Sequence, residues 1–463
     1  MVILAFTSTL SALDFDASLV ISYDPQLGVT KPSSFQLNDK GEIVYVRKKF
    51  YYFNREEGGK VITEIPEHYW AYDIKGINNS GAFVGEESFK REDQSGSWRV
   101  YHTFVYYPDL GVINLSELAS DMGEIDTSAR IAINDQGLVA GTIMAKDKDQ
   151  IFTYSPEDGF KIIKGTSIDQ KVVSLNNNGQ ILVRYEPKNF KPAHYIYDYK
   201  TKSRTELNDF GIIKTLKNEL KEYYFKGLNV FDHIKVLRMN DNGMIIGYVV
   251  VGDKETEYDG FLHRSEVYFV YSKDFGLKII PVSYRDYNSY QVAINNSNQI
   301  VITGHRLNEN NLEYTGEFGT YIWDPMNGLQ QLVNWENYFE DKWNDYVNYN
   351  NFVDFEQYLD WRFYLGSAAI NEQGEVFLVA RVEGIMHEDN PIIYWDTNNG
   401  GSLLFDLIKF DEKLKKVRPH HYSLMRRYRP SEFQINSRGE ILIRRVRRLD
   451  SLDDLTILLT PSS

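Results

Sequence analysis

One short pattern recurs eight times along this chain of 463 residues and constrains its fold more than any other feature. Each copy has an apolar residue, an Asn, two polar residues and usually a Gly, and an apolar strand follows, as in Ile133–Gly137. An Asn side chain can bond its own backbone two residues on, and Gly adopts a left-handed conformation at low cost. Each copy therefore predicts a tight β-hairpin turn. We interpret the repeated Asn as structural turn residues: Asn38, Asn78, Asn134, Asn176, Asn240, Asn295, Asn371 and Asn436.

The variation among the copies supports a structural role over a metal site. In the sixth copy Asn298 replaces the closing Gly, and Asn is the residue that best tolerates the left-handed conformation after Gly. The carboxylates of the pattern are few and interchange with Asn, Ser and Glu, whereas a calcium loop requires several of them. We expect no metal at these turns.

A second unit alternates with the first and completes a four-stranded repeat. It contains an aromatic strand, a turn with Gly and another strand, as in Phe104–Leu115 and Thr320–Leu329. Two hairpins per repeat, recurring about every 40 to 75 residues, are typical of β-propeller blades. The sequence therefore predicts an all-β, eight-bladed β-propeller. Seven blades is the alternative, if one irregular repeat does not form.

The two ends of the chain complement each other. The last repeat ends after three strands, the third of them at 455–460, and residues 19–24 can supply the missing one. We therefore expect the N- and C-terminal strands to share the last blade of a single domain over residues 18–463. Residues 1–17 are an extension. Its first 12 residues are apolar and small without a basic start, so they are either a truncated signal or an ordinary first strand.

Long insertions at 208–232, 334–366 and 406–431 fall between repeats, and we expect them on the face opposite the Asn turns. In the second of these, aromatic residues at helical spacing predict a helical hairpin. Its aromatic side chains either pack against the propeller or bind a partner, since Trp and Tyr are common anchors at interfaces. The candidate binding residues are Trp335, Tyr338, Trp343, Tyr346, Tyr349, Tyr358 and Trp361.

Composition excludes several classes of function. The net charge of −14 argues against nucleic-acid binding, which needs a basic face. The absence of Cys excludes disulfides, thiolate metal sites and cysteine nucleophiles. No apolar run is long enough for a transmembrane helix. No P-loop, G-x-S-x-G or H-E-x-x-H motif occurs, so the sequence indicates no cofactor and no catalytic residue.

The alternation of an I-N-x-x-G-x-[IV]-V-G hairpin with an aromatic strand resembles the HAF-repeat family of predicted extracellular bacterial proteins. Ile133–Gly141 and His102–Tyr106 carry the resemblance best, and the C-terminal strand Ile457–Pro461 adds to it. It extends over roughly residues 18–461, although His-Ala-Phe itself is absent. The resemblance implies a propeller-like fold and an extracytoplasmic setting, with a cytoplasmic one as the alternative. It implies no activity and no functional residues.

These observations predict a non-catalytic binding scaffold that engages a protein or polysaccharide partner through the face bearing the insertions. Two alternatives stay open. One is a glycan hydrolase or lyase with carboxylates at the central channel, and the other is a structural subunit of a surface or secretion assembly. Carboxylates with perturbed pKa values converging in one place would favour an enzyme.

Overall fold

The computed structural model shows an all-β chain that divides into two compact units. Unit 1 comprises Met1–Val29 and Asp341–Ser463, and unit 2 comprises Thr30–Glu340. The single domain predicted over residues 18–463 stays a prediction. The structure describes the following residues: 15–22, 34–46, 49–54, 56, 58–62, 69–93, 96–145, 148–163, 169–186, 193–207, 228–258, 261–284, 292–308, 314–334, 363–382, 392–396, 400–403, 408–409, 433–447 and 454–461.

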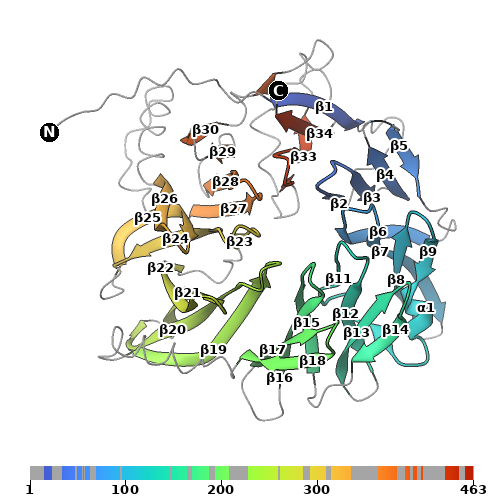
Figure 1. Ribbon diagram of the computed structural model, residues 1–463, viewed down its shortest axis with the longest axis horizontal. Coiled ribbons are helices and arrows are strands. Elements are labelled where there is room, and N and C mark those ends of the chain that lie inside the picture. Colours follow the sequence, from blue (N-terminus) through green and yellow to red (C-terminus); the bar gives the residue numbers. More distant parts are fainter. Residues whose placement is uncertain are drawn as a thin grey trace. The chain divides into compact units, whose positions relative to one another are not determined.

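Unit 2 is a succession of antiparallel sheets, each built from consecutive strands (Figure 1). The first sheet contains β2 (Ser34–Leu37), β3 (Ile43–Val46), β4 (Phe50–Asn54) and β5 (Gly58–Val61). The second contains β6 (Tyr69–Ile77), β7 (Phe83–Asp93), β8 (Gly96–Tyr107) and β9 (Gly111–Asn114). The third contains β10 (Glu124–Ile125), β11 (Ala132–Ile133), β12 (Val139–Met144), β13 (Asp149–Ser155) and β14 (Gly159–Ile163).

The remaining strands of unit 2 continue this pattern. The fourth sheet contains β15 (Asp169–Leu175), β16 (Gln180–Glu186), β17 (Ala193–Asp198) and β18 (Ser203–Glu206). Two further repeats join into one sheet, with β19 (Leu228–Met239), β20 (Ile245–Tyr258), β21 (Phe261–Ser272), β22 (Gly276–Tyr284), β23 (Val292–Ile294), β24 (Ile300–Leu307), β25 (Tyr314–Asp324) and β26 (Gly328–Asn334). The short helix α1 (Leu115–Ala119) follows β9 and begins at Asn114, whose side chain accepts from the backbone of Glu117.

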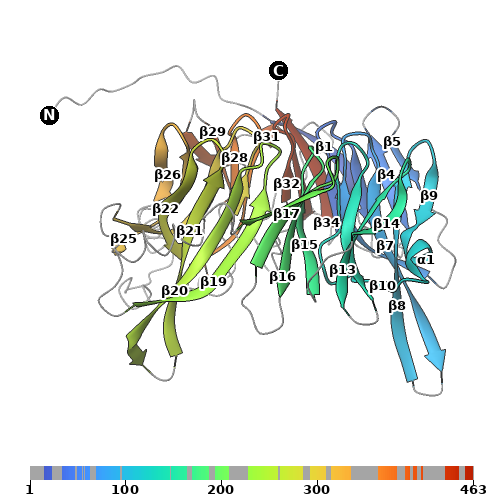
Figure 2. The ribbon, with the colours of Figure 1, turned by 60° about the horizontal axis from the view of Figure 1, so that its bottom comes forward.

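In unit 2, the first strand of a repeat is the one directly before its Asn turn, and from β2 to β19 it lies next to the first strand of the following repeat. β2 contacts β6, β6 contacts β11, β11 contacts β15, and β15 contacts β19. We call the side of unit 2 along which these first strands follow one another the inner side. Two hairpins, β7–β8 and β20–β21, are much longer than the others and extend beyond the body of their sheets (Figure 2).

The Asn turns have the geometry that the sequence indicates. In the third copy, the side-chain oxygen of Asn134 accepts hydrogen bonds from the backbone of Gln136 at 3.1 Å and of Leu138 at 2.9 Å. Gly137 closes the turn at a φ of 77°, and Asn298 takes the same left-handed region at 63°. The apolar strand that follows is buried, so the turn places the strand as well as reversing the chain.

The same Asn side chains also join neighbouring sheets of unit 2. The Nδ2 group of each Asn donates to the backbone oxygen of the corresponding Asn in the next repeat, over 2.9 to 3.1 Å, from Asn38 through Asn78, Asn134, Asn176 and Asn240 to Asn295. All six side chains are buried. Each Asn therefore fixes its own turn and its distance to the next repeat.

The residues after these Asn form a second line of hydrogen bonds, in which Asp and Asn alternate: Asp39, Asn79, Asp135, Asn177, Asp241 and Asn296. The Nδ2 group of Asn177 lies 2.9 Å from Oδ2 of Asp135 and 3.0 Å from Oδ2 of Asp241. Asn79 bridges Asp39 and Asp135 in the same way. Because carboxamides separate the carboxylates, each carboxylate accepts hydrogen bonds and none faces another directly.

Aromatic residues of the third strands pack over glycines of the second strands. Phe104 lies opposite Gly85, and Phe152 lies opposite Gly141. A Cβ atom at either glycine would come within 2.6 Å of the facing ring. This close approach explains why Gly follows the apolar strand in the repeat, and it places the aromatic strand in the core, with Phe104 and Phe152 buried.

The described residues of unit 1 form two sheets. One has β27 (Phe363–Ile370), β28 (Val376–Val382), β29 (Ile392–Asp396) and β30 (Gly400–Leu403). The other has β31 (Ile408–Lys409), β1 (Phe15–Ser22), β34 (Asp454–Pro461), β33 (Ile441–Arg447) and β32 (Phe433–Ile435), in that order. β1 pairs antiparallel with β34, from Phe15 opposite Pro461 to Ser22 opposite Leu455. A strand from the start of the chain thus completes the last sheet.

Candidate acid–base site on β6 and β7

A cluster of charged residues lies in the second sheet of unit 2, on the strands β6 and β7. Glu86 on β7 is directly opposite Asp73 on β6 and Thr103 on β8. Cross-strand partners share one face of a sheet, so the three side chains gather on the same face. Ser88, two residues after Glu86, lies on that face as well.

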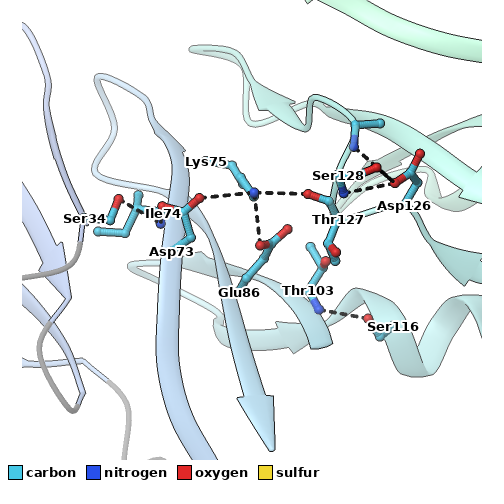
Figure 3. A network of polar contacts seen from close by, with 11 residues as sticks. Ser34, Asp73, Ile74, Lys75, Glu86, Thr103, Ser116, Asp126, Thr127 and Ser128 are labelled. Atoms are coloured by element: carbon cyan, nitrogen blue, oxygen red, sulfur yellow. Dashed lines mark hydrogen bonds and ion pairs between the residues drawn. The ribbon is translucent and has the colours of Figure 1, made fainter. Parts of the chain in front are cut away.

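A β-bulge adds Lys75 to this cluster. The pairing of β6 with β7 shifts register between Ile74 and Gly76, which leaves Lys75 as the extra residue. Bulges often redirect a side chain away from the regular alternation of a strand. The Nζ group of Lys75 lies 3.0 Å from Oε2 of Glu86, 3.2 Å from Oδ2 of Asp73 and 3.3 Å from the backbone oxygen of Thr127 (Figure 3).

Burial gives Glu86 an unusual pKa. Its side chain is 1% exposed, whereas those of Lys75 and Asp73 are 18% and 35% exposed. Burial raises the pKa of Glu86 to about 7, although the charge of Lys75 acts in the opposite direction. Burial also acts to lower the pKa of Lys75, but the charges of Glu86 and Asp73 outweigh it and raise that pKa. Glu86 is therefore the group of this cluster that exchanges a proton near neutral pH.

Three buried oxygens around Glu86 make no hydrogen bond to any residue that the structure describes. They are Oε1 of Glu86, Oγ1 of Thr103 and Oγ of Ser88. An unsatisfied buried polar group costs about 1 to 3 kcal/mol. Three of them on one face of a sheet leave a carboxyl group and two hydroxyls with unused hydrogen-bonding capacity.

A third carboxylate, besides those of Glu86 and Asp73, lies next to the cluster and differs in character from Glu86. Asp126, which is buried, accepts hydrogen bonds from the hydroxyl of Ser128 at 2.5 Å and from its backbone at 3.0 Å, and it lies 3.5 Å from Nζ of Lys171 on β15. Burial acts to raise the pKa of Asp126, but these interactions outweigh it and lower the pKa. Of the three carboxyl groups in this region, that of Asp126 is thus ionised and that of Glu86 titrates near pH 7.

No metal site is evident: among the described residues, no group of three or more His, Cys, Asp or Glu is arranged to hold a metal ion. Likewise, no helix in the described part of the chain is long and apolar enough to cross a membrane.

The candidate binding residues of the sequence analysis are not located by the structure. All seven, from Trp335 to Trp361, lie outside the described residues, as does most of the insertions at 208–232 and 406–431. The acid–base cluster was missed because its members occur in ordinary strand sequence. The sequence contained two signals. Lys75 is a charged residue near the apolar end of a strand, and Glu86 is a charged residue directly after the apolar stretch Phe83–Gly85.

No protein-family model and no curated protein sequence matches the chain. Solved structures with a similar arrangement include dipeptidyl peptidase 4 of Porphyromonas gingivalis, at 9% identity and a TM-score of 0.47, over 83% of this chain and 56% of that one. An acylaminoacyl peptidase of Pyrococcus horikoshii has 11% identity and a TM-score of 0.37, over 78% and 52%. TolB of Acinetobacter baumannii has 12% identity and a TM-score of 0.29, over 86% and 80%.

These similarities concern the fold, which is all-β and consistent with a β-propeller. The chain spans little more than half the length of the two peptidases. The prediction of a non-catalytic scaffold for a protein or polysaccharide, with its alternatives of a glycan-cleaving enzyme and an assembly subunit, is contradicted by this comparison. Several of the similar chains are named as peptidases or as a puromycin hydrolase.

Proposed function

We propose that this protein is an enzyme that uses Glu86 as a general base on a small polar substrate. One observation carries the proposal: the buried carboxyl of Glu86 has one oxygen held by Lys75, while its other oxygen has no partner among the described residues. A general base works best when its pKa lies near the operating pH, and the pKa of Glu86 is about 7.

The neighbouring residues fit this role. Lys75 orients the carboxylate through a 3.0 Å contact and stabilises its charged form. The free hydroxyls of Thr103 and Ser88 lie on the same face and can bind a polar group of the substrate. Asp73 and Lys75 are the members that reach solvent, so the cluster opens at that end.

Hydrolysis of chromogenic amides and esters tests the proposal between pH 5 and 9. Aminoacyl p-nitroanilides are the first substrates to use, since two of the similar structures are peptidases. The rate is expected to rise as the pH passes about 7, and Glu86→Gln is expected to lower it by about a hundredfold or more. Glu124→Gln, an exposed carboxyl on β10, is the control and should keep the wild-type rate. A Glu86→Gln variant with the wild-type rate and pH profile would refute the role of Glu86.

We also propose that the repeats close into an eight-bladed propeller in an extracytoplasmic protein of the HAF-repeat type, with seven blades as the alternative. Eight Asn turns and the pairing of β1 with β34 support this arrangement. Deleting residues 1–30 removes β1 and is expected to lower the melting temperature by roughly 10 °C or more, because β34 loses its partner strand. Deleting only residues 1–12 leaves β1 intact and serves as the control. An equal melting temperature for the two deletions would contradict the shared sheet.

A further inference from the structure

Three buried oxygens with unused hydrogen-bonding capacity come from adjacent positions in the second sheet of unit 2. Glu86 and Ser88 are two residues apart on β7, and Thr103 on β8 is directly opposite Glu86. Residues two apart on a strand share one face at a spacing of about 7 Å, and the Cβ atoms of a cross-strand pair lie about 5 Å apart. Figure 3 shows Glu86 and Thr103 side by side. One carboxyl and two hydroxyl groups are thus neighbours.

Protein covers this face of the sheet. Val84 and Val105, the next pair on the same face, pack in a core cluster that also contains residues of the third sheet and of α1. The backbone N–H of Thr103 donates to Oγ of Ser116 in α1 over 2.8 Å. All three side chains with unused capacity are at most 1% exposed. Bulk solvent therefore does not satisfy their oxygens.

The three oxygens are Oε1 of Glu86, Oγ of Ser88 and Oγ1 of Thr103, and they bond neither one another nor any other residue in the described part of the chain. Neighbouring polar groups that do not bond directly are commonly bridged by water. A buried water usually makes two to four hydrogen bonds to polar groups of this kind, and these residues offer three. A single water molecule therefore matches the number and the chemistry of the groups.

We propose that Thr103 and Ser88 hold the water molecule that Glu86 activates, so that the enzyme hydrolyses its substrate without a covalent intermediate. This inference rests on the proposed function of Glu86 as a general base. Lys75 contacts Oε2 of Glu86 at 3.0 Å, so Oε1 is the oxygen that accepts the proton. Both hydroxyls can donate to the oxygen of the water, while a hydrogen of the water points to Oε1. Thr103 and Ser88 are positioning residues in this arrangement.

The chemical step balances with the groups present. Glu86 takes one proton from the water, and the oxygen of the water forms a bond to the carbonyl carbon of an amide or ester. The bond from that carbon to the leaving nitrogen or oxygen then breaks, and Glu86 returns the proton to the leaving group. A hydroxide ion has three lone pairs, so two accept from the hydroxyls while the third attacks. The substrate approaches from the inner side, where Lys75 and Asp73 on β6 are partly exposed.

Steady-state kinetics of Thr103→Val and Ser88→Ala with an aminoacyl p-nitroanilide test the positioning role. Each variant is expected to lower kcat by about tenfold or more with little change in KM, because the water loses its position while the substrate keeps its contacts. Thr303→Val is the matched control, since Thr303 is also buried but its hydroxyl bonds that of Thr320 in another sheet. The control should keep the wild-type kcat.

Two kinetic outcomes would overturn the proposal. A raised KM at an unchanged kcat would mean that the hydroxyls bind the substrate, and a kcat equal to that of the control would mean that they have no role. Mass spectrometry of the acid-quenched reaction adds a further check. The protein should keep its free mass throughout, whereas an added acyl group would show that a hydroxyl of the protein attacks in place of water.

A crystal structure of the full chain at pH 8 gives a readout that does not depend on activity. A water within hydrogen-bond distance of the three oxygens is expected in the wild type and not in Thr103→Val. Normal hydrolysis with no water at this place would refute the inference and leave Glu86 as the general base. A water at this place without hydrolysis of any substrate would refute the proposed function, and the activation of water with it.

Discussion

Replacing Asn134 with Ala is expected to lower the free energy of unfolding by about 3 to 5 kcal/mol. The side chain accepts hydrogen bonds from the backbone of Gln136 and Leu138 and donates one to the backbone oxygen of Asn176. It is 4% exposed, so water cannot easily replace these partners. The substitution thus removes both the hydrogen bonds that hold one turn and the hydrogen bond to the next sheet.

Urea denaturation followed by tryptophan fluorescence measures this loss. Asn327→Ala is a matched control, because Asn327 lies in an exposed turn, where its side chain bonds only the neighbouring Asp324. Surface substitutions of this kind change stability by about 0.5 kcal/mol or less. If the two variants lose equal stability, the link between sheets contributes nothing, and the Asn is only a turn residue.

The repeat made the strands and turns of this fold predictable. The pattern of Asn, two polar residues and Gly has a local cause in turn chemistry, and local causes can be derived from a few adjacent residues. The aromatic strands are explained by a similar rule, since Phe104 and Phe152 lie over glycines at fixed places in the pattern. What the pattern alone did not reveal is that the same Asn also bonds to the next repeat.

One signal for the contacts between sheets was nevertheless present in the sequence. The residue after the repeated Asn alternates between Asp and Asn over six copies, from Asp39 to Asn296. A turn alone needs no such alternation. A line of neighbouring side chains requires the alternation, because adjacent carboxylates would repel each other, whereas a carboxamide between two carboxylates donates to both. Alternation at one position of a repeat therefore indicates contact between repeats.

The acid–base cluster was not predictable for a physical reason. Lys75 is placed by a β-bulge, and a single extra residue reverses which face a side chain occupies. No composition or spacing rule marked this bulge. In addition, the pKa of Glu86 depends on its burial and on neighbours in another strand, such as Lys75. The sequence analysis instead favoured the aromatic insertion, which lies outside the described residues.

Glu86→Gln is expected to remove a pH dependence of stability that the wild type has between about pH 4.5 and 7. The pKa of Glu86 is raised from 4.5 to about 7 on folding, so the folded state holds the proton more tightly than the unfolded state. Its contribution is therefore fully present below pH 4.5 and is lost as the pH rises to about 7. A shift of this size corresponds to about 3 kcal/mol. Gln resembles the protonated carboxyl, so the variant should match the wild type at pH 4.5 and be more stable at pH 8.

The difference between variant and wild type is the quantity to measure, because another group acts in the opposite direction. Burial and the charge of Arg184 lower the pKa of His194 to about 3, so its contribution is lost as the pH falls below 6.5. This effect is common to both proteins and cancels in the difference. Urea denaturation at intervals from pH 4.5 to 8 gives the difference, with Glu124→Gln as the exposed control. A difference that stays constant over this range would show that Glu86 does not change its charge near neutral pH, and its role as a general base would be excluded with it.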